Sequence, residues 1–572
     1  MADDPLPELY FATVRAMGTD LKATTDQLST TLTAAGYHVP KTVRLSDEMQ
    51  KAALCRRYLA PTGSSEYVTR NCLMTAGDGL RTFVGSDAIA YVAVDRLIEL
   101  RTQEAKVARR RGMRGIAWIL RSLMHEAEVS TLRDVLGSHF FVVSVYSDET
   151  RRADATRRQL GRTHNLNDEL TLDEQVEDLL ARDQGRDYRF EDDLKRMQRN
   201  DPDLAVARLS IEKTFFMADL FLDGDRNVAT DIDRFVRQIF SDPFGVATLD
   251  EVGMAHAFTA AYQSSITSRR VGAAIMVGAS LICTGRNDLP KAGGGQQSDS
   301  VAAAPGDLSN GLAVGKVRRR REAEALYNER SDVARDFLVR MLSSTEWLVG
   351  LAAVFPGVTE LSEAQRSTLV DSTLGMGFVQ DSRIFDLIEF NPSVHAEMSA
   401  VTTAARLGFA IAEGLLYTTT FPCHECTRHI ISSGLRRVVY LEPYAKSRAA
   451  ELFADQIRLS RSQSEEVDDG SANSPVDYVA FMGIAPRRHA ELFSWLDREG
   501  EKGELVDYQL DRTSPIRPSI EAPVSTELAA ARWRSRLKDQ KLVVKDLAQR
   551  LERGAVQSRT TARNSRAPRS SS

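Results

Sequence analysis

Residues 393–426, SVHAEMSAVTTAARLGFAIAEGLLYTTTFPCHEC, decide how the C-terminal half of the chain folds. An alanine-rich segment with helical periodicity (393–407) is followed by an apolar, β-branched run (415–420). A Pro-Cys step then opens a second helical segment (423–433). This alternation of helix, strand and helix predicts layers of helices packed on a sheet with parallel strands. Both helices begin with side chains that bind metals.

The polar residues of this stretch have the spacing of metal ligands. Cys423 and Cys426 lie three apart at the start of a helix, so both sulfurs point the same way and the helix N-terminus favours their thiolates. His395 supplies a nitrogen as third ligand, which leaves a tetrahedral Zn²⁺ one open position for water, as in catalytic sites. Glu397 is not needed as a ligand and is suited to carry a proton from that water to a ring nitrogen and a leaving amine.

Two further histidines leave alternatives open. His429, on the same predicted helix as Cys426, would close the site as the fourth ligand of a structural zinc, but Glu397 would then have no role. His424 lies between the cysteines, where it would compete as a ligand or face solvent or substrate. We expect the open, catalytic arrangement.

The pattern H-x-E followed by P-C-x-x-C is that of zinc deaminases that act on cytosine or adenine. Over most of residues 8–495 the chain resembles the deoxycytidylate deaminase family, and within it the two-domain bacterial anti-phage dCTP deaminases. This resemblance implies hydrolytic deamination of dCTP, dCMP or both, which depletes deoxycytidine nucleotides during phage infection. The segments that carry it are 18–21 (GTDL), 284–288 (TGRND), 290–295 (PKAGGG), 416–423 (LYTTTFPC), 442–447 (EPYAKS) and 483–488 (GIAPRR).

The resemblance also implies roles for single residues. It makes Glu397 the catalytic proton shuttle, and it makes His395, Cys423 and Cys426 the zinc ligands. Asn287 would hydrogen-bond the deoxyribose. The side chains suited to contact the phosphates, each equally well interpreted as an ordinary solvated surface residue, are Lys446, Ser447, Arg269 and Arg270.

The first 240 residues alternate between strands and helices, which predicts a parallel α/β domain. We expect its strands at 9–14, 140–146 and 218–223, and a further strand or buried segment at 116–123. A helix capped by Thr19 or Asp20 follows the first strand, and another helix covers 89–100. The resemblance identifies this half as a P-loop-kinase-like domain.

The loop after the first strand departs from a working P-loop, which needs glycines close to the phosphates and a lysine that reaches them. The family's loop, Gly-x-x-Gly-Thr-Asp, already lacks the lysine. Here Arg15 replaces the first glycine, while Gly18 and Thr19 remain as the candidate nucleotide-binding residues. We therefore expect a degenerate nucleotide-binding or regulatory domain that has lost phosphoryl transfer.

These observations predict an α/β protein with two main domains. A P-loop-kinase-like parallel-sheet domain (1–240) precedes a cytidine-deaminase-like α/β/α domain (245–500). The second domain has a large charged insert (297–390) that contains a helical run (323–342), a hairpin (271–283) and a polar surface loop (460–474). A helical extension (501–555), with a long helix from residue 526, and a disordered basic tail (556–572) follow.

Composition restricts the classes of function. The net charge is −5, and residues after Glu552 carry five arginines and no acid, so the rest of the chain is more acidic still. Such a body is poorly suited to neutralise phosphates, which disfavours the alternative of a deaminase acting on single-stranded nucleic acid. Five cysteines cannot all pair, and the longest apolar runs are too short to cross a membrane, so we expect a cytoplasmic protein without disulfides. Expected partners are deoxycytidine nucleotides, further copies of the chain, and a regulatory RNA or nucleotide.

Overall fold

The structure is a computed structural model of the 572-residue chain. It divides the chain into two compact units, Met1–Ala255 with Phe481–Ser572, and His256–Ala480. We call these the first and the second unit. The described residues are 7–51, 55, 59–164, 170–184, 211–266, 269–296, 331–341, 344, 362–374, 393–444, 447–460, 474–493, 498–499, 505–515, 528 and 531.

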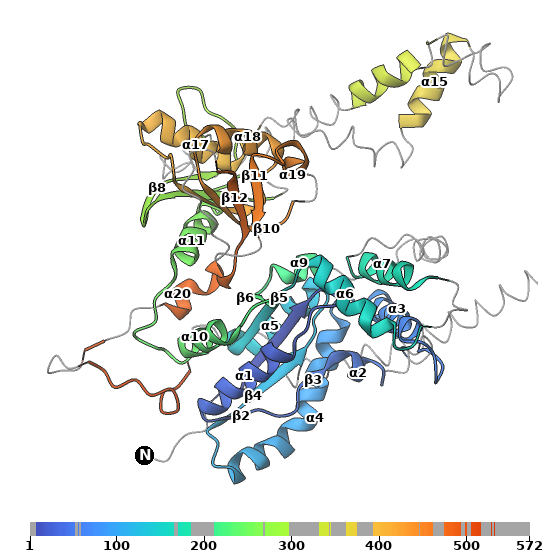
Figure 1. Ribbon diagram of the computed structural model, residues 1–572. Coiled ribbons are helices and arrows are strands. Elements are labelled where there is room, and N and C mark those ends of the chain that lie inside the picture. The colour runs from blue at the N-terminus through green and yellow to red at the C-terminus, as the bar shows by residue number, and fades with distance from the viewer. Residues whose placement is uncertain are drawn as a thin grey trace, which may run out of the picture. The chain divides into compact units, whose positions relative to one another are not determined.

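The first unit is built on a sheet with the strand order β13-β6-β5-β1-β4-β2, in which β3 also pairs with β4 (Figure 1). All pairs are parallel except that of β13 with β6. The predicted parallel α/β architecture is therefore present in this unit. Its strands are β1 (Leu9–Arg15), β2 (Tyr37–His38), β3 (Val43–Arg44), β4 (Gly115–Arg121), β5 (Phe140–Tyr146), β6 (Leu220–Asp223) and β13 (Gly483–Ile484).

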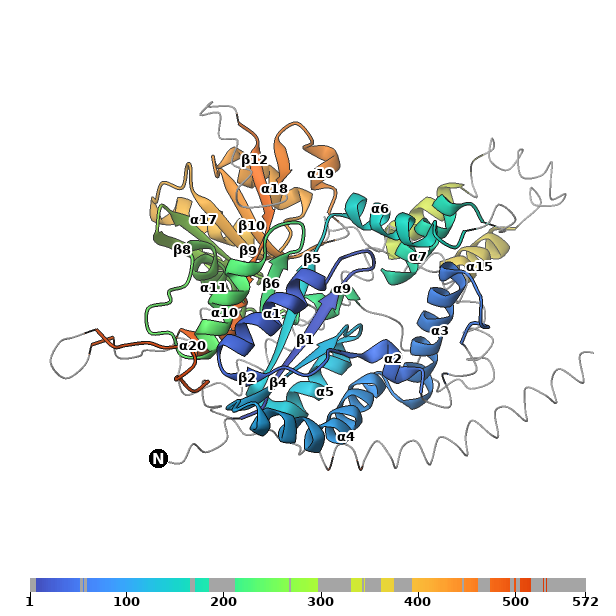
Figure 2. The same cartoon turned by 60° about the horizontal axis from the view of Figure 1, so that its bottom comes forward.

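Helices cover both faces of this sheet, so its central strands are apolar along their whole length. Residues 9–14 of β1 are all buried. Figure 2 shows α1 and α10 on one side of the sheet and α4 and α5 on the other. The longer helices are α1 (Lys22–Ala34), α3 (Glu66–Val84), α4 (Ala88–Arg110), α5 (Glu126–Leu136), α6 (Glu149–Leu160), α7 (Leu172–Asp183) and α10 (Ala229–Ile239), and the short ones are α2 (Leu45–Met49) and α9 (Ile211–Phe215).

The start of α1 differs from the prediction. Leu21 is its N-cap residue and makes no side-chain cap hydrogen bond, so neither Thr19 nor Asp20 occupies the cap position. Asp20 instead accepts a hydrogen bond from the Lys22 backbone N–H at 2.8 Å, which stabilises the turn that precedes the helix. The predicted helix at 89–100 is part of the longer α4.

The chain returns to the first unit after the second one. Strand β13 pairs with β6, and the buried Asp219 accepts hydrogen bonds from the Val142 N–H at 2.8 Å and from Arg488 Nε at 3.1 Å. Arg488 also donates to the Phe140 carbonyl at 2.6 Å. The predicted second domain extends to residue 500, whereas the structure groups Phe481 onward with the first unit because of these contacts.

The second unit has a six-stranded sheet with the order β11-β12-β10-β9-β7-β8. Strands β9 to β12 pair in parallel, and β7 is antiparallel to both β8 and β9, so the predicted hairpin is β7–β8. The elements are β7 (Gly272–Val277), β8 (Ser280–Arg286), β9 (Leu415–Thr420), β10 (Arg437–Glu442), β11 (Ile457–Ser460), β12 (Val476–Ala480), α11 (Leu249–Ala261), α17 (Ala396–Leu407), α18 (His424–Ser432) and α19 (Ala449–Leu452).

Two glycines let helices approach opposite faces of this sheet. A Cβ on Gly272 would lie 2.0 Å from the Ala257 carbonyl of α11, and one on Gly285 would lie 2.2 Å from the Ala396 carbonyl of α17. Gly285 pairs with Ala273, the neighbour of Gly272, and successive residues of a strand face opposite sides. The unit therefore has the predicted three layers, with α11 on one face and α17 on the other (Figure 1).

The insert and the C-terminal extension are described only in part. Residues 331–341 are helical, in agreement with the predicted helical run, and α15 spans Glu363–Leu374. The predicted polar loop, apart from its ends, and nearly all of the predicted helix from residue 526 and of the basic tail lie outside the described residues. No helix in the described part of the chain combines the length and the apolar character that a membrane span requires.

Candidate metal and catalytic site

Three backbone features bring the predicted ligands together. Val394 forms two backbone hydrogen bonds with Asp288, which hold the residue before His395 against the end of β8. His395 is the N-cap residue of α17. Cys423 follows β9 and is the N-cap residue of α18, where its Sγ accepts a hydrogen bond from the Cys426 N–H at 3.4 Å. Two helix N-termini thus meet at the carboxyl end of a parallel strand.

The three predicted ligands form one compact group. His395 Nδ1 lies 3.3 Å from Cys423 Sγ and 3.5 Å from Cys426 Sγ. The three atoms are all within 4.8 Å of one another, and among the described residues no other group of three or more metal-binding side chains converges in this way. Two sulfurs and one nitrogen at this spacing match three of the four ligands of a tetrahedral zinc ion.

The electrostatics of the group also fit a cation. The hydrogen bond from the Cys426 thiol, followed by that from His395, lowers the pKa of Cys423 although burial opposes this shift. The same bond to Cys423, together with burial, raises the pKa of Cys426. The pKa of His395 is raised, mainly by its hydrogen bond to Cys423. The group therefore holds a buried thiolate, which a metal ion stabilises.

Glu397 lies beside the ligands without being one of them. Its side chain is 4% exposed, and Cys426 Sγ donates a hydrogen bond to its Oε2 at 3.6 Å. Burial, and then the charge of Cys423, raises the pKa of Glu397 to about 7. A carboxyl group with a pKa near neutrality exchanges protons readily in both directions, which is what acid–base catalysis requires.

Neither alternative histidine belongs to the ligand group. The compact group contains neither His429 nor His424, so the structure gives no support to a closed site with four protein ligands. His424 Nδ1 is buried and has no hydrogen-bond partner among the described residues. Its position between the two cysteines keeps it next to the site.

The residues predicted to contact the substrate lie mainly in hydrogen-bonded loops. Asn287 Oδ1 accepts from Ser264 Oγ and from the Val271 N–H, both at 2.8 Å, and its Nδ2 donates to the Arg269 carbonyl at 2.8 Å. These bonds fix the loop that precedes β7. They also use most of the hydrogen-bonding capacity of the Asn287 amide. The contact of Asn287 with the deoxyribose stays a prediction.

Of the residues suited to contact the phosphates, Ser447 and Arg269 have contacts that explain their positions. Ser447 Oγ donates to the Pro422 carbonyl at 2.8 Å, next to the first cysteine of the site. Arg269 forms an ion pair with Glu442 at the end of β10. Arg270 is exposed. Lys446 lies outside the described residues.

Sequence reasoning did not assign roles to three residues that support the site. Asp288 is fully buried, pairs with Val394, and accepts from Ser265 Oγ at 2.6 Å. Tyr478 Oη donates to Thr427 Oγ1 at 3.1 Å, directly after the second cysteine. Gly285 allows α17 to approach. Only the glycine has a sequence signal, because an isolated glycine in a strand often marks a close backbone approach.

The candidate nucleotide-binding residues of the first unit lie in the loop between β1 and α1. Gly18 has φ +86°, and a Cβ there would lie 2.3 Å from the Arg152 carbonyl of α6. The close packing of this loop against α6 therefore requires a glycine, whether or not a nucleotide binds. Thr19 is buried, and its carbonyl accepts from Arg15 Nη1 at 2.7 Å. Their role toward a nucleotide stays a prediction.

Comparisons with known proteins find short similar stretches. Deoxycytidylate deaminase of Enterobacteria phage T2 is 40% identical over 55 residues, which are 10% of this chain and 29% of that protein. ComE operon protein 2 of Bacillus subtilis (strain 168) is 30% identical over 73 residues, which are 13% of this chain and 39% of that protein. The chain thus matches less than half the length of these relatives.

A solved structure is also similar in part. It is that of dCMP deaminase from the cyanophage S-TIM5 in its apo form, with 12% identity and a TM-score of 0.20 over 41% of this chain and 97% of that one. At family level, residues 247–442 match the model of the cytidine and deoxycytidylate deaminase zinc-binding region. This range includes His395, Glu397, Cys423 and Cys426. The range that resembles this zinc-binding region thus holds the converged His-Cys-Cys group, and the prediction of zinc is confirmed.

Proposed function

We propose that the protein hydrolyses the amino group of deoxycytidine nucleotides, converting dCMP, dCTP or both to the uridine nucleotide and ammonia. The observation that carries this proposal is the buried Glu397, which touches a converged His-Cys-Cys group without belonging to it. A structural zinc site has no use for a buried acid in that place. The deoxycytidylate deaminases among the relatives support the choice of the base and the sugar.

The residues of the site divide the chemistry between them. His395, Cys423 and Cys426 would hold Zn²⁺, which when bound makes water a nucleophile at neutral pH. Glu397 takes a proton from the attacking water and passes it to the ring nitrogen next to the reacting carbon. It then takes the second proton of that water from the new hydroxyl group on the reacting carbon and gives it to the departing amine as the C–N bond breaks, so that water and the cytosine base yield uracil and ammonia. Burial keeps Glu397 ready for both transfers by holding its pKa near 7.

The finer assignments rest on the resemblance to the two-domain bacterial group. We propose that the reaction depletes deoxycytidine nucleotides in defence against phage, and that the first unit is a P-loop-kinase-like domain without phosphoryl transfer. Arg15 stands where the family's loop has a glycine. Lys22, at the start of α1, is exposed and pairs with Asp26 at 2.7 Å, so it is engaged away from the loop. Self-association and regulation by RNA or a nucleotide remain expectations of the same resemblance.

Free nucleotides and single-stranded DNA offer the decisive comparison of substrates. We expect zinc-loaded protein to release ammonia from dCMP or dCTP and to leave cytosines in single-stranded DNA unchanged under the same conditions. Ammonia can be followed by a coupled assay and the DNA by sequencing. Editing of DNA without turnover of free nucleotides would replace the proposal with the nucleic-acid alternative, and no ammonia from any cytosine substrate would refute it.

A further inference from the structure

The edge of the sheet in the first unit is interrupted between β2 and β3. β2 ends at His38 and β3 begins at Val43, and both strands pair in parallel with β4. Between these pairs, four residues of the edge (39–42) lie opposite three residues of β4 (117–119). Pro40 has no backbone N–H and therefore cannot donate to the ladder of hydrogen bonds. The surplus residue makes a bulge, which in sheets often redirects side chains beside functional sites. We call residues 39–42 the edge bulge.

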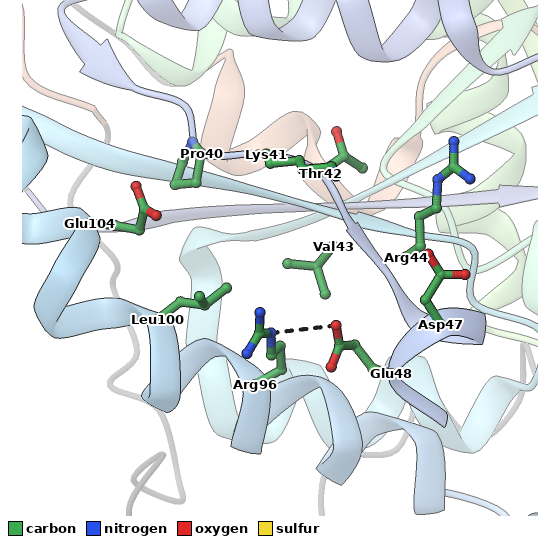
Figure 3. Close-up of a pocket in the computed structure, with 10 residues that line it drawn as sticks. All are labelled: Pro40, Lys41, Thr42, Val43, Arg44, Asp47, Glu48, Arg96, Leu100 and Glu104. Atoms are coloured by element: carbon green, nitrogen blue, oxygen red, sulfur yellow. Dashed lines mark ion pairs between the residues drawn. The ribbon is translucent and has the colours of Figure 1, made fainter. Parts of the chain in front are cut away.

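A cavity of about 390 Å³ lies beside the edge bulge (Figure 3). It is lined by residues of the bulge, of α2 and of α4, and its apolar lining consists of Pro40, Val43 and Leu100. This volume is within the range of small-molecule sites, about 300–1,000 Å³. Glu48 of α2 forms an ion pair with Arg96 of α4 at 3.4 Å. The two helices are therefore joined at the cavity.

The cavity has an acidic side and a basic side. Glu104 follows Arg96 by eight residues on α4, which is about 12 Å along the helix axis. Figure 3 shows Glu104 and Arg44 on opposite sides of the cavity, with Val43 between them. Glu104 Oε2 pairs with His38 Nε2 at 2.8 Å, and the two side chains are only 19% and 6% exposed. This pair fixes the acidic side against the edge strand.

The basic side has positive charge that no ion pair compensates. Lys41 and Arg44 are exposed, and in the described part of the chain neither forms an ion pair with an acid. Arg96 Nε is buried and has no hydrogen-bond partner among the described residues, although Glu48 lies within ion-pair distance. Buried donors in proteins nearly always have a partner. A donor of this kind beside two uncompensated cations favours a carboxylate group of a ligand.

The charged side chains of the lining restrict the net charge of a ligand. Three are positive and three are negative, namely Lys41, Arg44, Arg96, Asp47, Glu48 and Glu104. Figure 3 shows Asp47 and Glu48 on the basic side, where they would repel an anion with several charges. A ligand with one charge at each end and no net charge suits both sides of the cavity.

We propose that this cavity binds a small ω-amino acid, a zwitterion with its ammonium and carboxylate groups at opposite ends of an apolar chain. The carboxylate accepts a hydrogen bond from Arg96 Nε and lies in the field of Arg44. The ammonium group donates to the carboxylate of Glu104, and the apolar chain packs on Val43 and Leu100. This site lies in the first unit and does not depend on the proposed deaminase activity.

Ligand-observed NMR titration of the full-length protein tests the proposal. The probes are 6-aminohexanoate and 8-aminooctanoate, and the comparison compounds are the carboxylates and the alkylamines of the same two chain lengths. These compounds keep the apolar chain but carry only one of the two charges. We expect saturable binding of at least one ω-amino acid, and binding at least tenfold weaker for its carboxylate and its amine.

Substitutions at the two sides should change this preference in opposite ways. Glu104→Gln removes the partner of the ammonium group, so the ω-amino acid should lose at least fivefold in affinity and bind no better than the plain carboxylate. The double variant Lys41→Gln with Arg44→Gln should lose as much and bind the ω-amino acid no better than the alkylamine. Both residues of the double variant are exposed, so it should fold as the unchanged protein does, and circular dichroism checks each variant.

The matched control is Lys106→Gln, an exposed lysine on α4 that does not line the cavity. It lies two residues after Glu104, and residues two apart on a helix do not face the same way. This variant should bind the ω-amino acid as the unchanged protein does. The proposal would be overturned by the absence of saturable binding, by equal binding of the plain carboxylate, by equal affinity in all variants, or by an equal loss in Lys106→Gln.

Discussion

The two units place functional groups at the same kind of position, the carboxyl end of a parallel strand, but with opposite electrostatic design. After β9, a thiolate, a second thiol, an imidazole and a carboxyl group compensate one another within a few ångströms. After β1, burial and then the charge of Arg121 lower the pKa of Arg15, and Arg15 Nε and Thr19 Oγ1 make no hydrogen bond among the described residues. The first arrangement is what a metal ion needs, whereas the second leaves positive charge uncompensated. Charge, rather than fold, therefore distinguishes the two strand ends.

Removing a zinc ligand should have the largest effect on the second unit. Cys423→Ser removes one of the two sulfurs of the converged His-Cys-Cys group, so we expect loss of both bound zinc and ammonia release. Metal analysis by mass spectrometry and the deaminase assay measure the two. Cys72→Ser, which changes a cysteine of the first unit, is the control and should retain both. Full zinc content in Cys423→Ser would contradict the ligand assignment.

Breaking the buried ion pair that closes the first unit should lower its stability strongly. Asp219→Ala leaves Arg488 Nε and the Val142 N–H without their acceptor, and we expect a loss of about 3–5 kcal/mol in the free energy of unfolding. Denaturant titration measures it. Asp233→Ala removes an exposed partner of Arg237 and should cost about 1 kcal/mol or less. Equal effects of the two substitutions would show that the return of the chain through β13 does not stabilise this unit.

The same aspartate predicts how stability depends on pH. Burial raises the pKa of Asp219. The charges of Arg488 and then Arg133 together lower it by more than burial raises it, so the pKa in the folded protein is below the ordinary value. Its contribution is therefore present above about pH 4, the pKa of an unfolded aspartate, and is lost as the pH falls through the folded pKa. The difference in stability between Asp219→Asn and the unchanged protein should shrink below pH 4, and a constant difference would contradict this.

Crowding the contact between β8 and α17 should have an intermediate effect. A methyl group at Gly285 would meet the Ala396 carbonyl, so Gly285→Ala must displace the helix that begins after His395 and carries Glu397. We expect a loss of about 1–3 kcal/mol in stability and about a hundredfold loss of kcat. Ser280→Ala, at the exposed start of the same strand, is the control. Unchanged kcat in Gly285→Ala would show that this approach does not position the site.

The smallest effect is expected at the loop that Asn287 organises. Ser264→Ala removes a hydroxyl that donates to both the carbonyl and the Oδ1 of Asn287, which should cost about 0.5–1.5 kcal/mol in stability. If Asn287 contacts the deoxyribose, the KM for the nucleotide should rise while kcat changes little. An unchanged KM in both Ser264→Ala and Asn287→Ala would remove the sugar contact from the account.

The sequence predicted the site in the second unit well because its signal is local. Spacing alone placed both cysteines at the start of a helix and His395 at the start of another, and the structure brings them together as expected. The supporting residues could not be found in this way. The pairing of Asp288 with Val394 joins residues about a hundred positions apart, and such contacts leave no periodic pattern in the sequence.

The first unit shows the same division between local and distant information. Its strands were predicted from short apolar runs, and they are central strands of a parallel sheet. The ion pair of Asp219 with Arg488 was not predicted, because it depends on the chain returning from the second unit. The sequence indicates Arg15 as a substitution in a loop that would supply charge to a bound nucleotide. That Arg44 lies opposite Arg121 depends on strand order and register, which have no signal in the sequence.

Zinc content and ammonia release, measured on the same sample of Glu397→Gln, test the central claim most directly. We predict the zinc content of the unchanged protein together with a loss of about 10²–10⁴-fold in the rate of deamination of dCMP and dCTP. Glu451→Gln, an exposed glutamate on α19, is the matched control and should keep both. Turnover by Glu397→Gln at the rate of the unchanged protein, with zinc bound, would contradict the assignment of Glu397 as the group that moves the proton.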